Sequence, residues 1–267
     1  MTDTDWLELC HAAVTDVERV LAEMPTRAER ERVLGTGEGG DETTAIDQAA
    51  EDAIIERFRS TGASIVSEEV GVLAGSETLI VIDPIDGSLN AKRGIPFFSL
   101  SIAVASGGTM DDVHFGFVHD FGSGEEWTGR RGEGAWLNGT RLDPSLEERR
   151  GRDGRLEVLG IESADPRWVA ESIGALRESA YRLRALGTIA SSLCQVAGAR
   201  LDGMVSLRRA RGVDSAAGQL IVREAGGVVS FPSYANPLGA PLDGEPASPV
   251  VAARSLETLR ELERIPA

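Results

Sequence analysis

The sequence has 267 residues and carries 27 Lys and Arg against 43 Asp and Glu, which gives a formal net charge of −16. This charge argues against nucleic acid and anionic membranes as the main partners, because both select basic protein surfaces. A composition of 42% hydrophobic and 26% charged residues is typical of globular proteins and excludes a disordered or fibrous chain.

Helices come first along the chain, and strands follow. Hydrophobic residues three and four positions apart predict helices over 4–24 and 45–60, and a glycine-rich polar stretch predicts a loop over 35–42. Short apolar runs then predict strands over 63–67, 78–82, 97–105 and 113–119. The Asn138-Gly139 pair predicts a hairpin turn within 129–139.

Beyond an acidic and Arg-rich connector at 143–155, strands and helices alternate. The pattern predicts strands over 156–161, 181–185, 201–206, 228–231 and 249–253, and helices over 166–178, 188–199 and 214–225, before a last helix. We therefore expect an α/β protein with two halves, 1–142 and 143–267, that form one compact unit and meet at a cleft.

The sequence also bears on cellular location. Its acidic N-terminus lacks the basic and apolar regions of a signal peptide, and no apolar run approaches the roughly 18 residues of a membrane span. Cys10 and Cys194 have no metal-ligand spacing and are predicted to be buried thiols in a reducing compartment. We therefore expect a cytoplasmic protein without a membrane partner.

Acidic residues gather at three places beside predicted strands. Glu68 follows the strand 63–67, Asp83 and Asp86 follow the strand 78–82, and Asp214 opens a helix whose Ala and Gly residues allow tight packing on the sheet. Strand ends of this kind converge on a cleft in α/β proteins. The three places together favour one shared site.

The segment from Asp83 to Ser88 carries the most chemical information. Pro84 and Gly87 predict a turn directly after the strand, which brings Asp83 and Asp86 toward one point. Two such carboxylates repel unless a cation neutralises them, and oxygen ligands are those that Mg²⁺ prefers, so a site for two Mg²⁺ ions is predicted. Backbone N–H groups of Gly87 and Ser88 are then available to a phosphate. Taken alone, the segment is also compatible with an ordinary surface turn.

These residues belong to a series of motifs in which the sequence resembles the inositol monophosphatase family, Mg²⁺-dependent phosphatases that also include fructose-1,6-bisphosphatases. The motifs, in chain order, are Asp41-x-x-Thr44-x-x-Asp47, Ser67-Glu68-Glu69, Asp83-Pro84-Ile85-Asp86-Gly87-Ser88-x-Asn90, Gly94-Ile95-Pro96-Phe97, Gly132-x-Gly134-Ala135-x-x-Asn138-Gly139, Asp214-x-Ala216-Ala217-Gly218 and Glu224-Ala225-Gly226-Gly227. They span nearly the whole chain at the family's spacing. The resemblance implies an αβαβα layered sandwich and a homodimer.

The resemblance also implies a set of metal ligands. Glu68, Asp83 and the backbone carbonyl of Ile85 would hold the first Mg²⁺ ion. Asp83, Asp86 and Asp214 would hold the second, and Glu68 would serve a weaker third ion through water. Two or three Mg²⁺ ions per site are therefore expected.

The remaining implied roles concern water and substrate. Asp47 and Ser88 would orient the attacking water, and the N–H groups of Gly87 and Ser88 would hold the phosphate. Thr44 and Asp47 also fit the start of a helix, where Thr or Asp is a common N-cap. Gly187-Thr188 matches a substrate-contacting position of the family and equally fits a helix N-cap.

Departures from the family pattern affect the choice of substrate. Val213 stands where the family commonly has Trp, and Leu207 stands where animal members have a glutamate that helps to bind inositol. Arg208, Arg209 and Arg211 follow, and these features resemble archaeal-type members, several of which hydrolyse both inositol 1-phosphate and fructose 1,6-bisphosphate. The three Arg side chains are candidate ligands of a second phosphate, or else they face solvent and pair with surface acids.

We therefore predict a Mg²⁺-dependent phosphomonoesterase that hydrolyses inositol 1-phosphate, fructose 1,6-bisphosphate or both, with water as the nucleophile. One alternative is a phosphatase for 3′-phosphoadenosine 5′-phosphate or NADP. Another is a non-catalytic regulatory relative, which the intact Glu68, Asp83, Asp86 and Asp214 disfavour.

Overall fold

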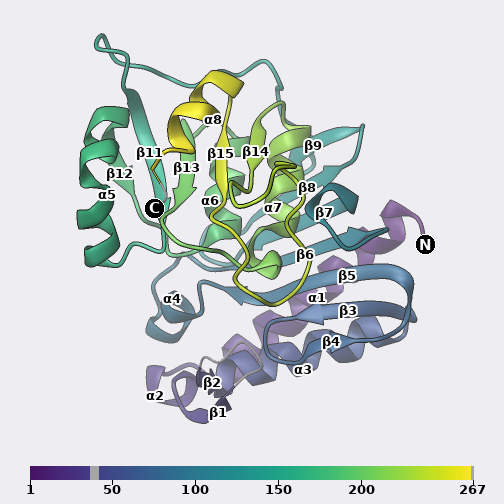
Figure 1. The fold of residues 1–267 in the computed structure, drawn as a ribbon. Helices are drawn as coiled ribbons and strands as arrows, with labels where there is room; N and C mark the ends of the chain where they lie inside the picture. The colour runs from purple at the N-terminus through teal and green to yellow at the C-terminus, as the bar shows by residue number, and fades with distance from the viewer. Residues whose placement is uncertain (37–41, 266–267) are drawn as a thin grey trace.

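Two large β-sheets and three helix layers make up the core of the fold, and a third sheet has only two short strands. The computed structural model describes residues 1–36 and 42–265, and their layers follow one another as helix, sheet, helix, sheet and helix (Figure 1). Three buried clusters of hydrophobic side chains fill the spaces between these layers. The predicted αβαβα sandwich is thereby confirmed.

The larger sheet has eight strands in the order β10-β9-β8-β7-β6-β5-β3-β4. Their bounds are β3 (Ala63–Ser67), β4 (Gly71–Leu73), β5 (Ser76–Asp86), β6 (Ser99–Ala105), β7 (Val113–Asp120), β8 (Glu125–Arg130), β9 (Gly134–Leu137) and β10 (Thr140–Arg141). All neighbours are antiparallel except β3 and β5, which are parallel. Every residue of β6 is buried, because helices cover both faces of the sheet at this strand.

The smaller sheet has five strands in the order β12-β11-β13-β15-β14. Their bounds are β11 (Leu156–Glu162), β12 (Ala180–Arg184), β13 (Gly203–Ser206), β14 (Val228–Ser230) and β15 (Val251–Ala253). The strand β11 is parallel to both β12 and β13, so the carboxyl ends of these three strands lie at one edge of the sheet.

Helices form the other three layers. The outer helices α1 (Asp3–Glu23) and α3 (Ala45–Arg59) cover the larger sheet, and α5 (Pro166–Ser179) and α8 (Leu256–Leu262) cover the smaller one (Figure 1). The helices α6 (Ile189–Ala197) and α7 (Gly212–Glu224) lie between the two sheets. A Cβ at Gly116 of β7 would stand 2.8 Å from the carbonyl oxygen of Ala217, so glycine there lets α7 pack directly on the sheet.

Short elements complete the described residues. They are α2 (Arg27–Arg30), β1 (Val33–Thr36), β2 (Glu42–Thr44), α4 (Ser88–Arg93) and the 3-10 helix η1 (Met110–Asp112). Because β1 and β2 pair antiparallel, the prediction of a loop over 35–42 is wrong at its two ends. The middle of that loop, at 37–41, lies outside the described residues, and so does Asp41 of the first motif.

Most predicted elements are present within a few residues of their expected bounds. Asn138 and Gly139 have positive φ values of 48° and 73° between β9 and β10, which confirms the hairpin turn. Cys10 and Cys194 are buried. None of the described helices combines the length and the apolar character that crossing a membrane requires. The division into halves at 143–155 stays a prediction.

Candidate active site

The carboxylates of Asp83 and Asp86 lie on an irregular part of β5. The prediction of a strand that stops at 82 and turns is wrong, since β5 continues to Asp86. Asp83 pairs with Ser101 of β6 and Asp86 with Ser99, so β5 has one residue more than its partner in this interval. In a regular strand, residues three apart point to opposite faces. The extra residue, next to a proline that has no N–H, brings both carboxylates to one side.

Glu68 and Asp214 approach this place from two other elements. Glu68 directly follows β3, and because β3 is parallel to β5 with Ser67 beside Ile82, Glu68 emerges next to Asp83. Asp214 lies in the first turn of α7, where its Oδ2 accepts a hydrogen bond of 3.2 Å from the backbone N–H of Arg211. The positive end of the helix dipole favours a carboxylate there.

Burial and mutual repulsion dominate the electrostatics of these acids. Burial, and next the charge of Glu68, raise the pKa of Asp83 well above its ordinary value, and the charges of Asp86 and Asp214 add to this shift. Burial followed by the charge of Asp214 raises the pKa of Glu68 to about 7. Burial also raises the pKa of Asp86 to about 7, although Thr188 and Ala190 donate hydrogen bonds to it. The four carboxylates thus share one site and destabilise one another.

The donor set fits a hard divalent cation. Glu68, Asp83, Asp86 and Asp214 all offer carboxylate oxygens, the ligand type that Mg²⁺ prefers. A cation would also remove the repulsion around Asp83. In the part of the chain that the structure describes, no group of three or more His, Cys, Asp or Glu side chains already stands in a metal-holding arrangement. Instead, the guanidinium of Arg211 pairs with Glu68. Metal binding by Glu68 therefore requires this ion pair to open.

A small cavity connects the metal-ligand candidates with Asp47. It measures about 10 Å³ and is lined by Asp47, Glu51, Glu68, Glu69, Asp83, Pro84 and Ile85. This volume is close to that of one enclosed water molecule. The structure therefore brings together Asp47, Glu68, Asp83 and Ile85 around one cavity, and Glu51 and Glu69 line it as well.

Gly87 and Ser88 begin a short helix beside these carboxylates. Gly87 is the N-cap of α4 with φ of 89°, a conformation that favours glycine. A Cβ at Gly87 would also lie 3.0 Å from the carbonyl oxygen of Gly187 and 3.1 Å from that of Phe97. Ser88 is the first residue of α4. The close approach of Gly87 to Gly187 brings the two predicted substrate-contacting segments together.

A larger cavity of about 380 Å³ opens next to Asp86. Its lining includes Asp86, Asn90, Glu162, Ser163, Gly187 and Thr188. Thr188 is the N-cap of α6, and its hydroxyl also donates to Asp86 Oδ2 at 2.5 Å. Its contact with a substrate stays a prediction. The size and polarity of this cavity suit a small sugar or polyol.

The three candidate Arg side chains lie in different surroundings. Arg208 stacks over the ring of Trp168 at 4.9 Å and pairs with Glu171 at 2.5 Å, both on α5. Arg209 is exposed. Arg211 reaches Glu68 within the carboxylate cluster. The structure therefore brings Arg211, but not Arg208, to the predicted metal ligands.

Three polar residues that shape the site were given no role from the sequence. Lys92 lies 2.8 Å from Asp47. Glu162 at the end of β11 accepts hydrogen bonds from the N–H groups of Leu186 and Gly187, at 3.1 and 3.0 Å. Asn90 donates to the carbonyl oxygens of Leu186 and Phe97, both at 2.7 Å. Two of these residues could have been found from the sequence. Lys92 is the one Lys in an Arg-rich sequence, and Glu162 follows an apolar run as Glu68 does.

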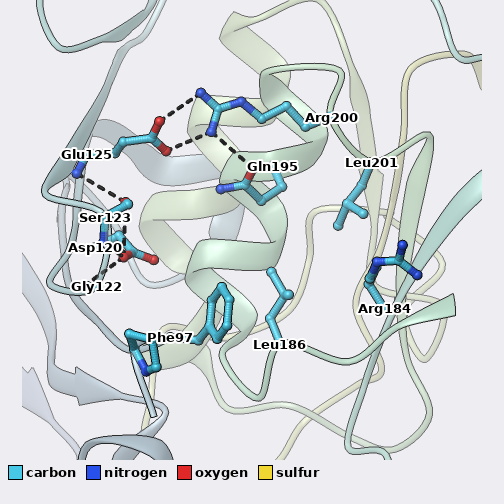
Figure 2. Close-up of a pocket in the computed structure, with 11 residues that line it drawn as sticks. Phe97, Asp120, Gly122, Ser123, Glu125, Arg184, Leu186, Gln195, Arg200 and Leu201 are labelled. Carbon is cyan, nitrogen blue, oxygen red and sulfur yellow. Dashed lines mark hydrogen bonds and ion pairs between the residues drawn. The ribbon is translucent and has the colours of Figure 1, made fainter. Parts of the chain in front are cut away.

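A further cavity, of about 490 Å³, contains none of the predicted site residues (Figure 2). Phe97 and Leu186 line one end of it, and the ion pair between Arg200 and Glu125, at 2.7 Å, lies at the other. None of Glu68, Asp83, Asp86 and Asp214 lines this cavity, whereas Asp86 lines the cavity of about 380 Å³.

Comparisons with known proteins show similarity over most of this chain. The model of the inositol monophosphatase family matches residues 5–265. A fructose-1,6-bisphosphatase/inositol-1-monophosphatase of Thermococcus kodakarensis is 34% identical over 85% of this chain and 84% of its own. The Nus factor SuhB of Haemophilus influenzae is 36% identical over 75% of this chain and 76% of its own. The crystal structure of an inositol monophosphatase–fructose 1,6-bisphosphatase superposes with a TM-score of 0.84 at 27% identity, covering 97% of this chain and 99% of the other.

Proposed function

We propose that this chain, which belongs to the inositol monophosphatase family, is a Mg²⁺-dependent phosphatase for inositol 1-phosphate, fructose 1,6-bisphosphate or both. The family consists of metal-dependent phosphomonoesterases. The observation that supports the proposal most directly is the crowding of Glu68, Asp86 and Asp214 around the buried Asp83. A buried cluster of this kind is unfavourable without a cation and suits phosphate chemistry with one.

In the proposed mechanism, Glu68, Asp83, Asp86, Asp214 and the carbonyl oxygen of Ile85 would hold Mg²⁺. Bound Mg²⁺ supplies positive charge that lowers the pKa of water and stabilises negative charge on phosphate and leaving oxygens.

The other residues position the reactants. Asp47 and Ser88 orient the attacking water in line with the phosphorus–oxygen bond, and the N–H groups of Gly87 and Ser88 hold the phosphate. The sugar or polyol occupies the cavity beside Thr188. Water attacks phosphorus and releases a proton to solvent, the bond to the ester oxygen breaks, and that oxygen takes up a proton from solvent and leaves as an alcohol.

A panel of substrates tests this function. Phosphate release is measured with and without Mg²⁺ from inositol 1-phosphate, fructose 1,6-bisphosphate, 3′-phosphoadenosine 5′-phosphate and NADP. The proposal expects Mg²⁺-dependent release from one or both of the first two. Faster release from either nucleotide would support the nucleotide phosphatase instead. No release from any of the four would favour a regulatory role, the candidate to which the likeness to a Nus factor points.

The proposal includes a homodimer in the cytoplasm. Light scattering on the purified protein then gives a mass of twice 28.3 kDa. A mass equal to one chain at micromolar concentration would contradict the dimer and leave the catalytic proposal intact.

Replacement of Ser88 by Ala tests the role of its hydroxyl. We expect kcat to fall about 100-fold with little change in KM, because orientation of the water matters mainly in the transition state. Steady-state kinetics in saturating Mg²⁺ measure both constants. A rise in KM alone would mean that Ser88 binds the substrate and does not orient the water.

Single Arg→Ala variants test the binding of a second phosphate by Arg208, Arg209 and Arg211. If one of them holds that phosphate, its variant raises KM for fructose 1,6-bisphosphate about tenfold or more, the effect of a lost charged hydrogen bond. KM for inositol 1-phosphate changes much less, since this substrate has no second phosphate. Equal losses on both substrates, or no loss in any variant, would favour inositol 1-phosphate as the substrate.

A further inference from the structure

The only Lys in the sequence lies beside the residue that is proposed to orient the attacking water. All the other basic residues in this chain are Arg, 26 of the 27 Lys and Arg. The Nζ of Lys92 lies 2.8 Å from Oδ2 of Asp47, and the two side chains are only 14% and 9% exposed. An ion pair that is shielded from water in this way holds its geometry more firmly than a surface pair.

The contacts of Asp47 are concentrated on one of its two carboxylate oxygens. Oδ2 accepts hydrogen bonds from the Thr44 hydroxyl at 2.6 Å and from the Thr44 N–H at 3.2 Å, and the ion pair with Lys92 meets the same atom. These three contacts to one oxygen restrict the rotation of the carboxylate. Among the described residues, none forms a hydrogen bond with the other oxygen, Oδ1.

Lys92 also connects Asp47 to the helix that carries Ser88. The helix α4 runs from Ser88 to Arg93, and residues four apart in a helix lie on the same face. Ser88 and Lys92 therefore face the same side of α4. The ion pair between Lys92 and Asp47 therefore joins α4 to the first turn of α3, where Asp47 lies.

The chemistry of the contact explains the use of Lys at this position. An ammonium group is a compact charge that approaches a single oxygen, whereas a guanidinium prefers to bind both oxygens of a carboxylate. A bidentate Arg would engage Oδ1 as well as Oδ2. The single oxygen contact of Lys92 leaves Oδ1 available for water.

We propose that Lys92 is a positioning residue for the attacking water, acting through Asp47. It holds the carboxylate by Oδ2 so that Oδ1 accepts a hydrogen bond from the water that Ser88 also contacts. This inference rests on the proposed phosphatase function, and no proton is transferred to or from Lys92.

Kinetics of Lys92→Met and Asp47→Asn, alone and together, test the proposal. Met has a similar length without charge, and its variant is expected to lose about 100-fold in kcat with KM unchanged, the effect of a misplaced reacting group. In the Asp47→Asn background, Lys92→Met should cost less than about twofold, since Lys92 acts through Asp47. Lys92→Arg should lose about tenfold in kcat, less than Lys92→Met, because it keeps the charge on Oδ2 but its guanidinium also engages Oδ1.

Two controls separate positioning from stability. The side chain of Arg93, the next residue on α4, is 51% exposed. Its replacement by Met removes a neighbouring charge and should leave kcat and KM unchanged. Thermal unfolding should show Lys92→Met folded at the assay temperature. In addition, selective labelling of lysine yields a single side-chain NMR signal, and Asp47→Asn should shift it.

Several results would overturn the proposal. The first is a kcat of Lys92→Met within about threefold of the wild type, or a change in its KM alone. The second is an equal loss of kcat from Lys92→Met in the wild type and in Asp47→Asn. The third is a lysine NMR signal that Asp47→Asn does not shift. The failure of the proposed function is a different result, namely no phosphate release by the wild type from any substrate of the panel. The lysine signal still tests the contact with Asp47 in that case.

Discussion

Replacement of Asp83 by Asn is expected to abolish phosphate release while the metal-free protein becomes more stable. Asp83 is proposed to bind both Mg²⁺ ions, so kcat/KM should fall about a thousandfold or more. In the metal-free protein, Asp83 is buried among Glu68, Asp86 and Asp214, which disfavour its charge. The Asn amide has nearly the same shape, and its oxygen still accepts the bond of 3.0 Å from the N–H of Ile85. Phosphate release and thermal unfolding in EDTA measure the two effects.

A surface variant provides the control for this experiment. Asp52→Asn makes the same chemical change on α3 at an exposed position and should alter neither activity nor stability beyond about 0.5 kcal/mol. Near-normal release by Asp83→Asn in saturating Mg²⁺ would contradict the two-metal proposal. Loss of folded protein in EDTA would instead contradict the account of repulsion at Asp83.

Helices with clear periodicity and end signals were predictable from the sequence alone. The helix α3 begins at Ala45, after the N-cap Thr44, and buries Ala50, Ile54 and Phe58, which are spaced four residues apart. Local capping and a continuous apolar face both favour this helix, so tertiary contacts did not alter the predicted secondary structure.

Strands that depend on their neighbours were not predictable in the same way. The strand β8, Glu125–Arg130, has no apolar alternation of its own and forms because it pairs with β7 and β9 on either side. The extension of β5 beyond Pro84 likewise depends on pairing with β6, although a proline in the sequence argues against a strand there. Propensity alone cannot supply such pairings.

The residues of the candidate site likewise fall into those that a local sequence pattern indicates and those that depend on distant contacts. Asp83, Asp86, Glu68 and Asp214 were identified because acids at strand and helix ends form a local signal. The hydrogen bonds of Glu162 to the N–H groups of Leu186 and Gly187 join residues about two dozen positions apart, which no local pattern indicates. The same holds for the pairing of Arg211 with Glu68, 143 residues away. The assignments of these residues to roles stay predictions until the variants are measured.

The metal-free protein is expected to lose stability as the pH rises from about 5 to 8. Burial is the main reason that the pKa values of Glu68, Asp86 and Glu162 lie at about 7 in the folded protein, whereas ordinary carboxylates titrate near pH 4. Between those values the folded protein binds more protons than the unfolded chain. The free energy of unfolding therefore decreases with pH in this window, by up to about 1.4 kcal/mol per pH unit for each group.

Thermal unfolding in EDTA across this pH range measures the effect, which should lower Tm by about 5 °C or more. High ionic strength screens repulsion among surface carboxylates but not among buried ones, so the decrease should persist in salt. Mg²⁺ competes with protons for Glu68 and Asp86, and its stabilising effect should therefore be larger at pH 8 than at pH 5. The decrease should be smaller in Asp83→Asn, which removes one of the interacting charges. A Tm in EDTA that is constant or rises from pH 5 to 8 would mean that these carboxylates are already ionised without metal, and the argument for a cation from their repulsion would fail.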